Sequence, residues 1–125
     1  MNTSSHVKSI VWLGSSRTDL KAFPDEVRDV VGYALYQAQI GLKAAEAKPL
    51  HGFGGAGVLE IVDYYQGDTY RAVYTVKFAD IIYVLHTFQK KSKKGRATPK
   101  PDIDLIKRRL RAAEQHFKNT ERRKT

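Results

Sequence analysis

The chain has 125 residues, of which 42% are hydrophobic and 28% charged, and these values are typical of one soluble globular domain. With 22 Lys and Arg against 13 Asp and Glu, the formal net charge is +9, which favours a polyanionic partner such as RNA, DNA, the ribosome, an acidic protein or an anionic membrane surface. The absence of cysteine excludes disulfides and thiolate metal sites, and no apolar run approaches the ~20 residues that cross a bilayer, so we expect a cytoplasmic protein that enters no membrane.

The first part of the chain predicts a strand, a helical turn and a helix. Residues 8–13 form a short β-rich run that ends at Gly14, and a helical turn is expected over residues 17–22. Pro24 suits the first turn of a second helix, which Gly41 ends. Its apolar residues recur at helical spacing and predict a core-facing side: Val27, Val30, Val31, Ala34, Leu35 and Ala38.

After a long connection over residues 42–57, the sequence predicts a β-rich half and a last helix. Three β runs are expected at about 58–66, 69–78 and 81–90, with turns at Gly67-Asp68 and Ala79-Asp80. The last helix begins near Pro101, and its apolar stripe consists of Ile103, Ile106, Leu110, Ala113 and Phe117. We expect residues 1–6 and 120–125 to be disordered.

The order of these elements predicts the fold class. One domain over residues 1–125 is expected, with the order β-α-α-β-β-β-α. Such an order is typical of an α+β fold with a mainly antiparallel sheet and helices packed on one of its faces.

The segment Gly52–Gly57, GFGGAG, matches the dinucleotide pattern G-x-G-x-x-G only in its letters. A dinucleotide site needs a strand before the glycines and a helix after them, whereas here a helix precedes and a strand follows. The four histidines are too scattered for a local metal motif. We therefore expect neither a cofactor nor a metal ion.

Hairpin parity predicts which side chains share a face of the sheet. With Gly67-Asp68 as the first turn, Tyr64 lies opposite Arg71 and Val62 opposite Val73; with Ala79-Asp80 as the second, Arg71 lies opposite Phe88 and Val73 opposite His86. One face is then mainly apolar, with Leu59, Ile61, Tyr65, Tyr70, Ala72, Tyr74, Val76, Phe78, Ile81, Tyr83 and Leu85. The other is mixed and includes Glu60, Tyr64, Arg71, Ile82, Val84, His86, Phe88 and Lys90.

The mixed face has the residue types that RNA binding and RNA cleavage require. Tyr64 and Phe88 can stack on unpaired bases, and Arg and Lys can hold phosphates. RNA supplies its own nucleophile, the 2′-hydroxyl, so a protein needs only an acid, a base and cations around the crowded phosphate. Arg71, His86 and Lys90 are candidates for these roles, and no metal is required.

Structural roles are the alternative for each of these residues. Arg71 can pair with Glu60 or Asp63, and His86 can be a hydrogen-bonded structural histidine. Tyr64 and Phe88 can be covered by a loop or by the last helix. The cations from Lys90 to Lys100 can belong to a solvated connector.

Two segments, YRAVY (70–74) and IIYVLHTFQKKSKKGRATP (81–99), have the pattern of a known family, and they are supported by FPDEVRDVVGYALYQAQIG (23–41) and KPLHGFGGAGVLEI (48–61). These segments resemble the RelE/ParE toxin superfamily of bacterial toxin–antitoxin pairs, and more closely its phage-related HigB-like branch. The resemblance covers roughly residues 8–117, and VLHTFQKK is its most specific part. It implies a RelE-like fold and, commonly, ribosome-dependent cleavage of mRNA.

The resemblance also implies roles for individual residues. The arginine of its YR motif falls on Arg71, and its histidine, phenylalanine and paired lysines fall on His86, Phe88, Lys90 and Lys91. Glu60 is expected to support the site, but many relatives continue this glutamate as Glu-Leu-Arg, whereas this chain has Glu60-Ile61-Val62. Further RNA or ribosome contacts are expected from the basic connector: Lys91, Lys93, Lys94 and Arg96.

The sequence therefore favours a toxin that is a metal-free mRNA endonuclease, monomeric when alone and inhibited by a helix-turn-helix antitoxin. Two alternatives stay open, because the superfamily uses different residues in different branches and its ParE members act on DNA gyrase. One is a ParE-like inhibitor that binds gyrase or another protein. The other is an inactive prophage-derived binding module.

Overall fold

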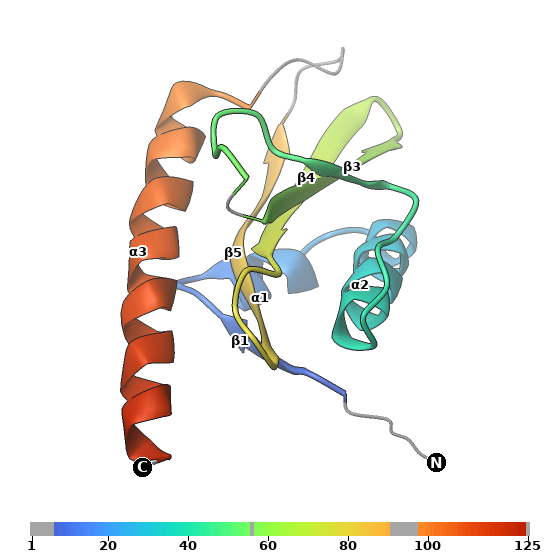
Figure 1. The fold of residues 1–125 in the computed structure, drawn as a ribbon. Helices are drawn as coiled ribbons and strands as arrows, with labels where there is room; N and C mark the ends of the chain where they lie inside the picture. Colours follow the sequence, from blue (N-terminus) through green and yellow to red (C-terminus); the bar gives the residue numbers. More distant parts are fainter. Residues whose placement is uncertain (1–6, 56, 91–97, 125) are drawn as a thin grey trace.

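The computed structural model describes residues 7–55, 57–90 and 98–124, which form a five-stranded sheet with helices on both faces (Figure 1). The expected α+β class with a mainly antiparallel sheet is confirmed, and one short strand, β2, lies in the stretch that the sequence predicts as a connection. The elements in chain order are β1 (Ser9–Trp12), α1 (Ser16–Lys21), α2 (Asp25–Gln39), β2 (Ala47–Pro49), β3 (Val58–Tyr65), β4 (Asp68–Thr75), β5 (Ile81–Lys90) and α3 (Lys100–Arg123).

The strand order in the sheet is β1-β5-β4-β3-β2. β1 pairs with β5 in parallel, and the other three pairs are antiparallel. β4 therefore occupies the centre, and seven of its eight residues are buried. A strand buried on both faces must be covered on both sides, so each face of β4 needs its own layer.

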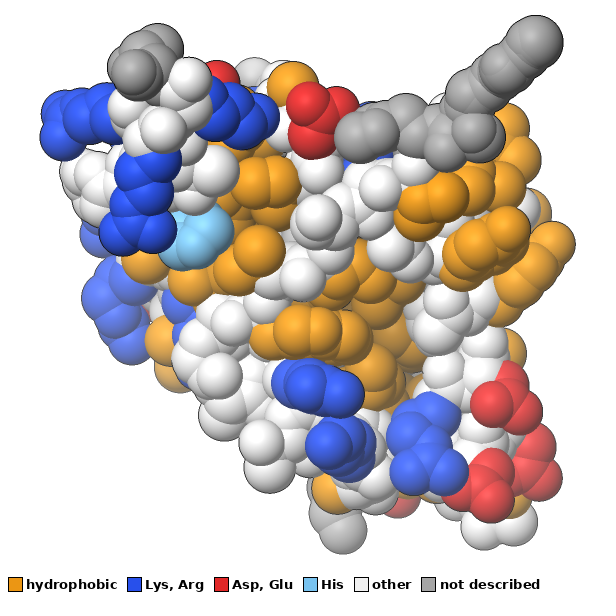
Figure 2. Space-filling view, turned by 90° about the horizontal axis from the view of Figure 1, so that it is seen from below, with side chains coloured by type: hydrophobic (Ala, Val, Ile, Leu, Met, Phe, Trp, Pro, Cys, Tyr) orange, Lys and Arg blue, Asp and Glu red, His pale blue; other side chains and the backbone are white. Residues whose placement is uncertain are grey.

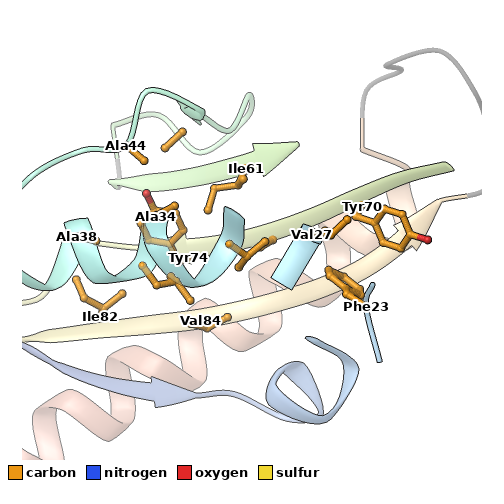
Figure 3. Packing of buried hydrophobic residues seen from close by; sticks show 14 residues of the cluster. Phe23, Val27, Ala34, Ala38, Ala44, Ile61, Tyr70, Tyr74, Ile82 and Val84 are labelled. Carbon is orange, nitrogen blue, oxygen red and sulfur yellow. The ribbon is translucent and has the colours of Figure 1, made fainter. Parts of the chain in front are cut away.

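Helix α2 covers one face of the sheet through the side that its helical spacing predicts. Val27, Val31, Ala34, Leu35 and Ala38 are buried there. They pack with sheet residues that alternate along the strands, among them Ile61, Ala72, Tyr74, Ile82 and Val84 (Figure 3). Phe23 closes this core next to Tyr70, with its ring edge toward the tyrosine and the ring centroids 5.0 Å apart.

Helix α3 packs against the opposite face, so the expectation of helices on a single face holds for α2 and not for α3. Ile106 and Ala113 of α3 are buried in a second core with Val73, Tyr83 and Leu85. Val73 lies between Ala72 and Tyr74 in β4, and successive side chains of a strand point to opposite faces. Figure 1 shows the sheet between the two helices. The predicted apolar stripe of α3 is confirmed as the side that faces this core.

The β3–β4 hairpin turns one residue earlier than its sequence predicts. Gln66 and Gly67 form the turn with φ values of 50° and 87°, and Tyr65 pairs with Asp68. A two-residue turn with positive φ at both positions matches the twist of the strands. The predicted partners are therefore wrong by two residues, since Arg71 lies opposite Val62 and Val73 opposite Glu60. An even shift keeps every side chain on its predicted face.

A β-bulge divides β5 into two halves, and the predicted faces hold in the half after the bulge and fail in the half before it. The predicted pairs Arg71–Phe88 and Val73–His86 are confirmed, but the next residue, Tyr74, pairs with Val84, so Leu85 is the extra residue. One extra residue reverses the alternation beyond it. Tyr83 and Leu85 therefore face α3, while Ile82 and Val84 face α2, the opposite of the predicted assignment.

Two further features concern the ends of the chain and membranes. Helix α3 extends to Arg123, so residues 120–123 are helical, whereas the sequence predicts disorder from residue 120. No helix breaker follows Phe117, and the Thr120 hydroxyl donates to the His116 carbonyl within the last turns. Residues 1–6 and 125 lie outside the described part. Within the described residues, no helix is long and apolar enough to cross a membrane.

Candidate functional site

Arg71 lies at the centre of the candidate site, on the face of β4 that α3 covers. Its guanidinium is largely buried, and the residue is only 2% exposed. Nη1 donates to Glu60 Oε1 at 3.0 Å and to Thr98 Oγ1 at 3.4 Å. The structural alternative for Arg71, an ion pair with Glu60, is thus present in the fold. Glu60 is in β3, two residues before Val62, and Val62 lies opposite Arg71 in β4.

His86 lies on the neighbouring strand, opposite Val73, and is 7% exposed. Its Nε2 is 2.8 Å from Asp102 Oδ1 in the first turn of α3. The Phe88 ring is stacked on the imidazole, with centroids 4.5 Å apart and planes inclined by 17°. Nδ1 is buried and has no hydrogen-bond partner among the described residues. The ring is therefore fixed by one carboxylate and one aromatic plane.

The other predicted site residues on the strands differ in their surroundings. Tyr64 is 62% exposed near the end of β3, so its ring is available for stacking on a base. Phe88 is half-buried and already in contact with His86, and Lys90 is half-buried at the last position of β5, opposite Thr69. The structure thus brings Arg71, His86 and Phe88 together, with Tyr64 and Lys90 toward the edge of the same face.

The predicted basic contacts of the connector, Lys91, Lys93, Lys94 and Arg96, lie outside the described residues. Their roles stay predictions. The structure places only the two ends of this connector, Lys90 on β5 and Thr98 before α3, on the candidate site.

Two residues of the site were missed from the sequence. Thr98 lies just before α3 and contacts Arg71, and Asp102 lies in the first turn of α3 and contacts His86. The sequence explains Asp102 by the helix dipole alone, since a carboxylate is favoured in the first turn of a helix. The sequence contains one signal for these contacts. Few residues separate the end of β5 from Pro101, so the last helix has to begin close to the end of that strand.

A groove of about 330 Å³ borders the site where β5 extends beyond β1. Asp19, Ala22 and Phe23 line one side of it, and residues 86–89 line the other. Nearby, Arg109 Nη1 donates to the carbonyl of the bulge residue Leu85 at 2.9 Å. Burial lowers the pKa of Arg109, and the charge of Asp19 opposes that shift. The groove is therefore flanked by one acidic and one basic group besides His86.

The described residues contain no group of three or more His, Cys, Asp or Glu side chains that could hold a metal ion. The glycine-rich loop before β3 has its glycines at positive φ, including Gly52, Gly54, Gly55 and Gly57. It is followed by a strand, as the sequence indicates, so no helix N-terminus is available there to bind a pyrophosphate. The described side chains at the candidate site include guanidinium, imidazole and carboxylate groups.

Positive charge is not gathered into a single patch on the face that Figure 2 shows. Seen from below Figure 1, Lys and Arg side chains occupy several separate places, with apolar side chains between them. On this face the positive charge is therefore divided among separate groups of side chains.

Comparison with known proteins identifies the family. Residues 18–111 match the family described as "Phage derived protein Gp49-like (DUF891)". The chain belongs to this family. It is a RelE/HigB-like toxin family, which confirms the resemblance of the YRAVY and VLHTFQKK segments to the phage-related branch.

Two further comparisons add little to this assignment. No curated protein matches the chain. Among solved structures, the chain is similar to one from the toxin–antitoxin complex RelBE2 of Mycobacterium tuberculosis, with a TM-score of 0.41 and 17% sequence identity. That match covers 73% of this chain and 100% of the other.

Proposed function

We propose that this protein is the toxin of a toxin–antitoxin pair and cleaves mRNA on the ribosome. The observation that carries the proposal is the placement of Arg71 and His86 on neighbouring strands of one face, within a chain of the Gp49-like family. Attack by the 2′-hydroxyl on the adjacent phosphate would leave a 2′,3′-cyclic phosphate and a 5′-hydroxyl, and no metal is needed.

Each residue has a defined role in this proposal. Arg71 and Lys90 stabilise negative charge on the phosphate, and His86 transfers the proton as acid or base. Tyr64 and Phe88 stack on bases, while Lys91, Lys93, Lys94 and Arg96 bind the RNA backbone or the ribosome. Glu60 supports the site by holding the Arg71 guanidinium.

The proposed partner is a helix-turn-helix antitoxin with an acidic or amphipathic segment. The net charge of +9 favours such a segment, because opposite charges attract and speed association. We place the complex in the cytoplasm, where mRNA and ribosomes are found.

The test uses the chain and its variants in cells with translating ribosomes, followed by mapping of mRNA 5′ ends. We expect new 5′ ends with the unchanged chain and their loss with Arg71→Ala. Because Arg71 is buried, Arg71→Lys and the less buried Lys90→Ala are included as variants with smaller effects on folding, and Arg111→Ala on the exposed side of α3 is the matched control. Unchanged cleavage by folded Arg71 and Lys90 variants would overturn this site.

A second candidate function is favoured by the burial of the site. Arg71 and His86 are shielded beneath the start of α3, which suits a non-nuclease inhibitor that binds DNA gyrase or another protein through its outer surface. Induction distinguishes the two functions. Translation arrest supports the nuclease, DNA damage with filamentous growth supports the gyrase inhibitor, and unaffected growth supports an inactive binding module.

A further inference from the structure

The first turn of α3 contributes to the candidate site a carboxylate that no comparison assigns to it. Asp102 Oδ1 lies 2.8 Å from His86 Nε2, although the residues are 16 positions apart and belong to different elements. The Asp102 side chain is 27% exposed, while that of His86 is 9% exposed. The contact is therefore partly shielded from water, which strengthens a charge-assisted hydrogen bond.

The contact determines where the imidazole hydrogen is. A carboxylate can only accept a hydrogen bond, so the hydrogen between the two groups is on Nε2 of His86. A neutral ring then has its proton-accepting lone pair on Nδ1. The stacked Phe88 ring fixes the plane of the imidazole, so both the orientation and the tautomer of His86 are defined.

Nδ1 is buried and has no hydrogen-bond partner among the described residues. A buried polar atom without a partner destabilises the fold unless a ligand or water satisfies it. Such atoms in native structures are often explained by a functional role. A ribose hydroxyl that reached Nδ1 would meet a nitrogen already prepared to accept its proton.

We propose that Asp102 is a positioning residue for His86 in the cleavage reaction. This inference rests on the proposed function. Asp102 holds Nε2–H, keeps Nδ1 as the basic nitrogen, and stabilises the imidazolium that forms when the 2′-hydroxyl proton is transferred to Nδ1. The proton transferred to His86 then returns to the leaving 5′-oxygen or to solvent, so the ring ends the reaction neutral.

Other charged groups lie near His86 and have other contacts. Asp19 of α1 lines the same groove, and Arg109 of α3 binds the neighbouring Leu85 carbonyl. Arg71 lies on the adjacent strand and is paired with Glu60. Asp102 is the carboxylate in direct contact with the ring, so its removal should have the largest effect on the tautomer of His86.

The test compares Asp102→Asn with Asp104→Asn, a change of the same kind two residues later in α3 at a carboxylate that pairs with Lys100 instead. The first readout is the nitrogen NMR spectrum of the His86 ring in the purified proteins above pH 8, assigned with His86→Gln. We expect one tautomer, with Nε2 protonated, in the unchanged chain and in Asp104→Asn, and a mixture of tautomers in Asp102→Asn. The same tautomer in all three would overturn the inference, whether or not the protein cleaves RNA.

The second readout is single-turnover cleavage of ribosome-bound mRNA at several toxin concentrations. We expect Asp102→Asn to lower the maximal rate by at least about tenfold and to leave the apparent substrate affinity unchanged, because the imidazolium that forms during the reaction loses its carboxylate. Asp102→Glu should recover part of the rate. A faster Asp102→Asn or one equal to Asp104→Asn would contradict a positioning role. If the unchanged chain cleaves no RNA, the proposed function is contradicted. The NMR measurement still tests whether Asp102 fixes the tautomer of His86.

Discussion

At the residue scale, Arg71 and His86 lie on neighbouring strands and contact different carboxylates. Arg71 pairs with Glu60 of β3, whereas His86 pairs with Asp102 of α3. The first pair joins two strands of the sheet, and the second joins the sheet to a helix. The same side chains that are candidates for catalysis therefore also hold the fold together, and variants must be judged for both effects.

Glu60→Gln tests how much the pair with Arg71 stabilises the fold. The Arg71 and Glu60 side chains are 3% and 18% exposed, so the change leaves a buried charge with weaker compensation. We expect the free energy of unfolding to fall by about 1–3 kcal/mol in urea denaturation. The control is Glu114→Gln, whose pair with Lys77 has side chains 38% and 40% exposed. A loss of less than about 1 kcal/mol is expected there, and equal losses would contradict the importance of burial.

Tyr74→Phe tests a buried hydroxyl in the core between α2 and the sheet. Burial raises the pKa of Tyr74 to about 12, and its hydroxyl has no hydrogen-bond partner among the described residues. Since the folded pKa lies above that of an unfolded tyrosine, about 10, the unfolded chain loses this proton first and stability falls as the pH rises from about 10 to 12. We expect Tyr74→Phe to be at least as stable as the unchanged chain at pH 7, because the change removes a buried hydroxyl without a partner among the described residues, and to lose less stability at pH 11, measured by urea denaturation. An equal loss of stability between pH 7 and pH 11 in both proteins would contradict the assignment of this pH dependence to Tyr74.

At the element scale, helix α3 has two roles, one in the core and one at the candidate site. Its apolar stripe packs on the second core, and its first turn contacts the candidate site. Because a helix is stiff, the packing of Ile106 one turn after Asp102 determines where the carboxylate lies. The stability of α3 on the sheet and the geometry at His86 are therefore linked.

Ile106→Ala measures how much the packing of α3 on the sheet stabilises the fold. Ile106 is completely buried in the second core, so its truncation should lower the free energy of unfolding by about 2–5 kcal/mol, while the exposed neighbour Lys107→Ala should change it by less than about 0.5 kcal/mol. Urea denaturation provides both values. A small loss for Ile106→Ala would mean that α3 contributes little to the fold.

The sequence predicts elements better than it predicts their contacts. The stripe of α2, the stripe of α3 and the common face of Arg71, His86 and Phe88 follow from periods of 3.6 and 2, which short stretches of sequence contain. The bulge at Leu85 does not, because nothing in an alternating run marks an extra residue. Nor does the contact of Asp102 with His86, which depends on the path of the connector between β5 and α3.

At the scale of the whole molecule, the net charge of +9 predicts that binding to the ribosome is largely electrostatic. We expect affinity for ribosomes to fall steeply between 50 and 200 mM salt, by up to about 10³-fold if roughly six phosphates are contacted. Sedimentation with ribosomes at several salt concentrations measures the slope. An affinity independent of salt would contradict a phosphate-binding role.

The most direct test of RNA cleavage uses the purified chain, translating ribosomes and a defined mRNA, with analysis of the new RNA ends. The account predicts cleavage with a 5′-hydroxyl on one fragment and a 2′,3′-cyclic phosphate on the other, and loss of cleavage in folded Arg71→Lys. Intact mRNA with the unchanged chain, or fragments with 5′-phosphate ends, would contradict it.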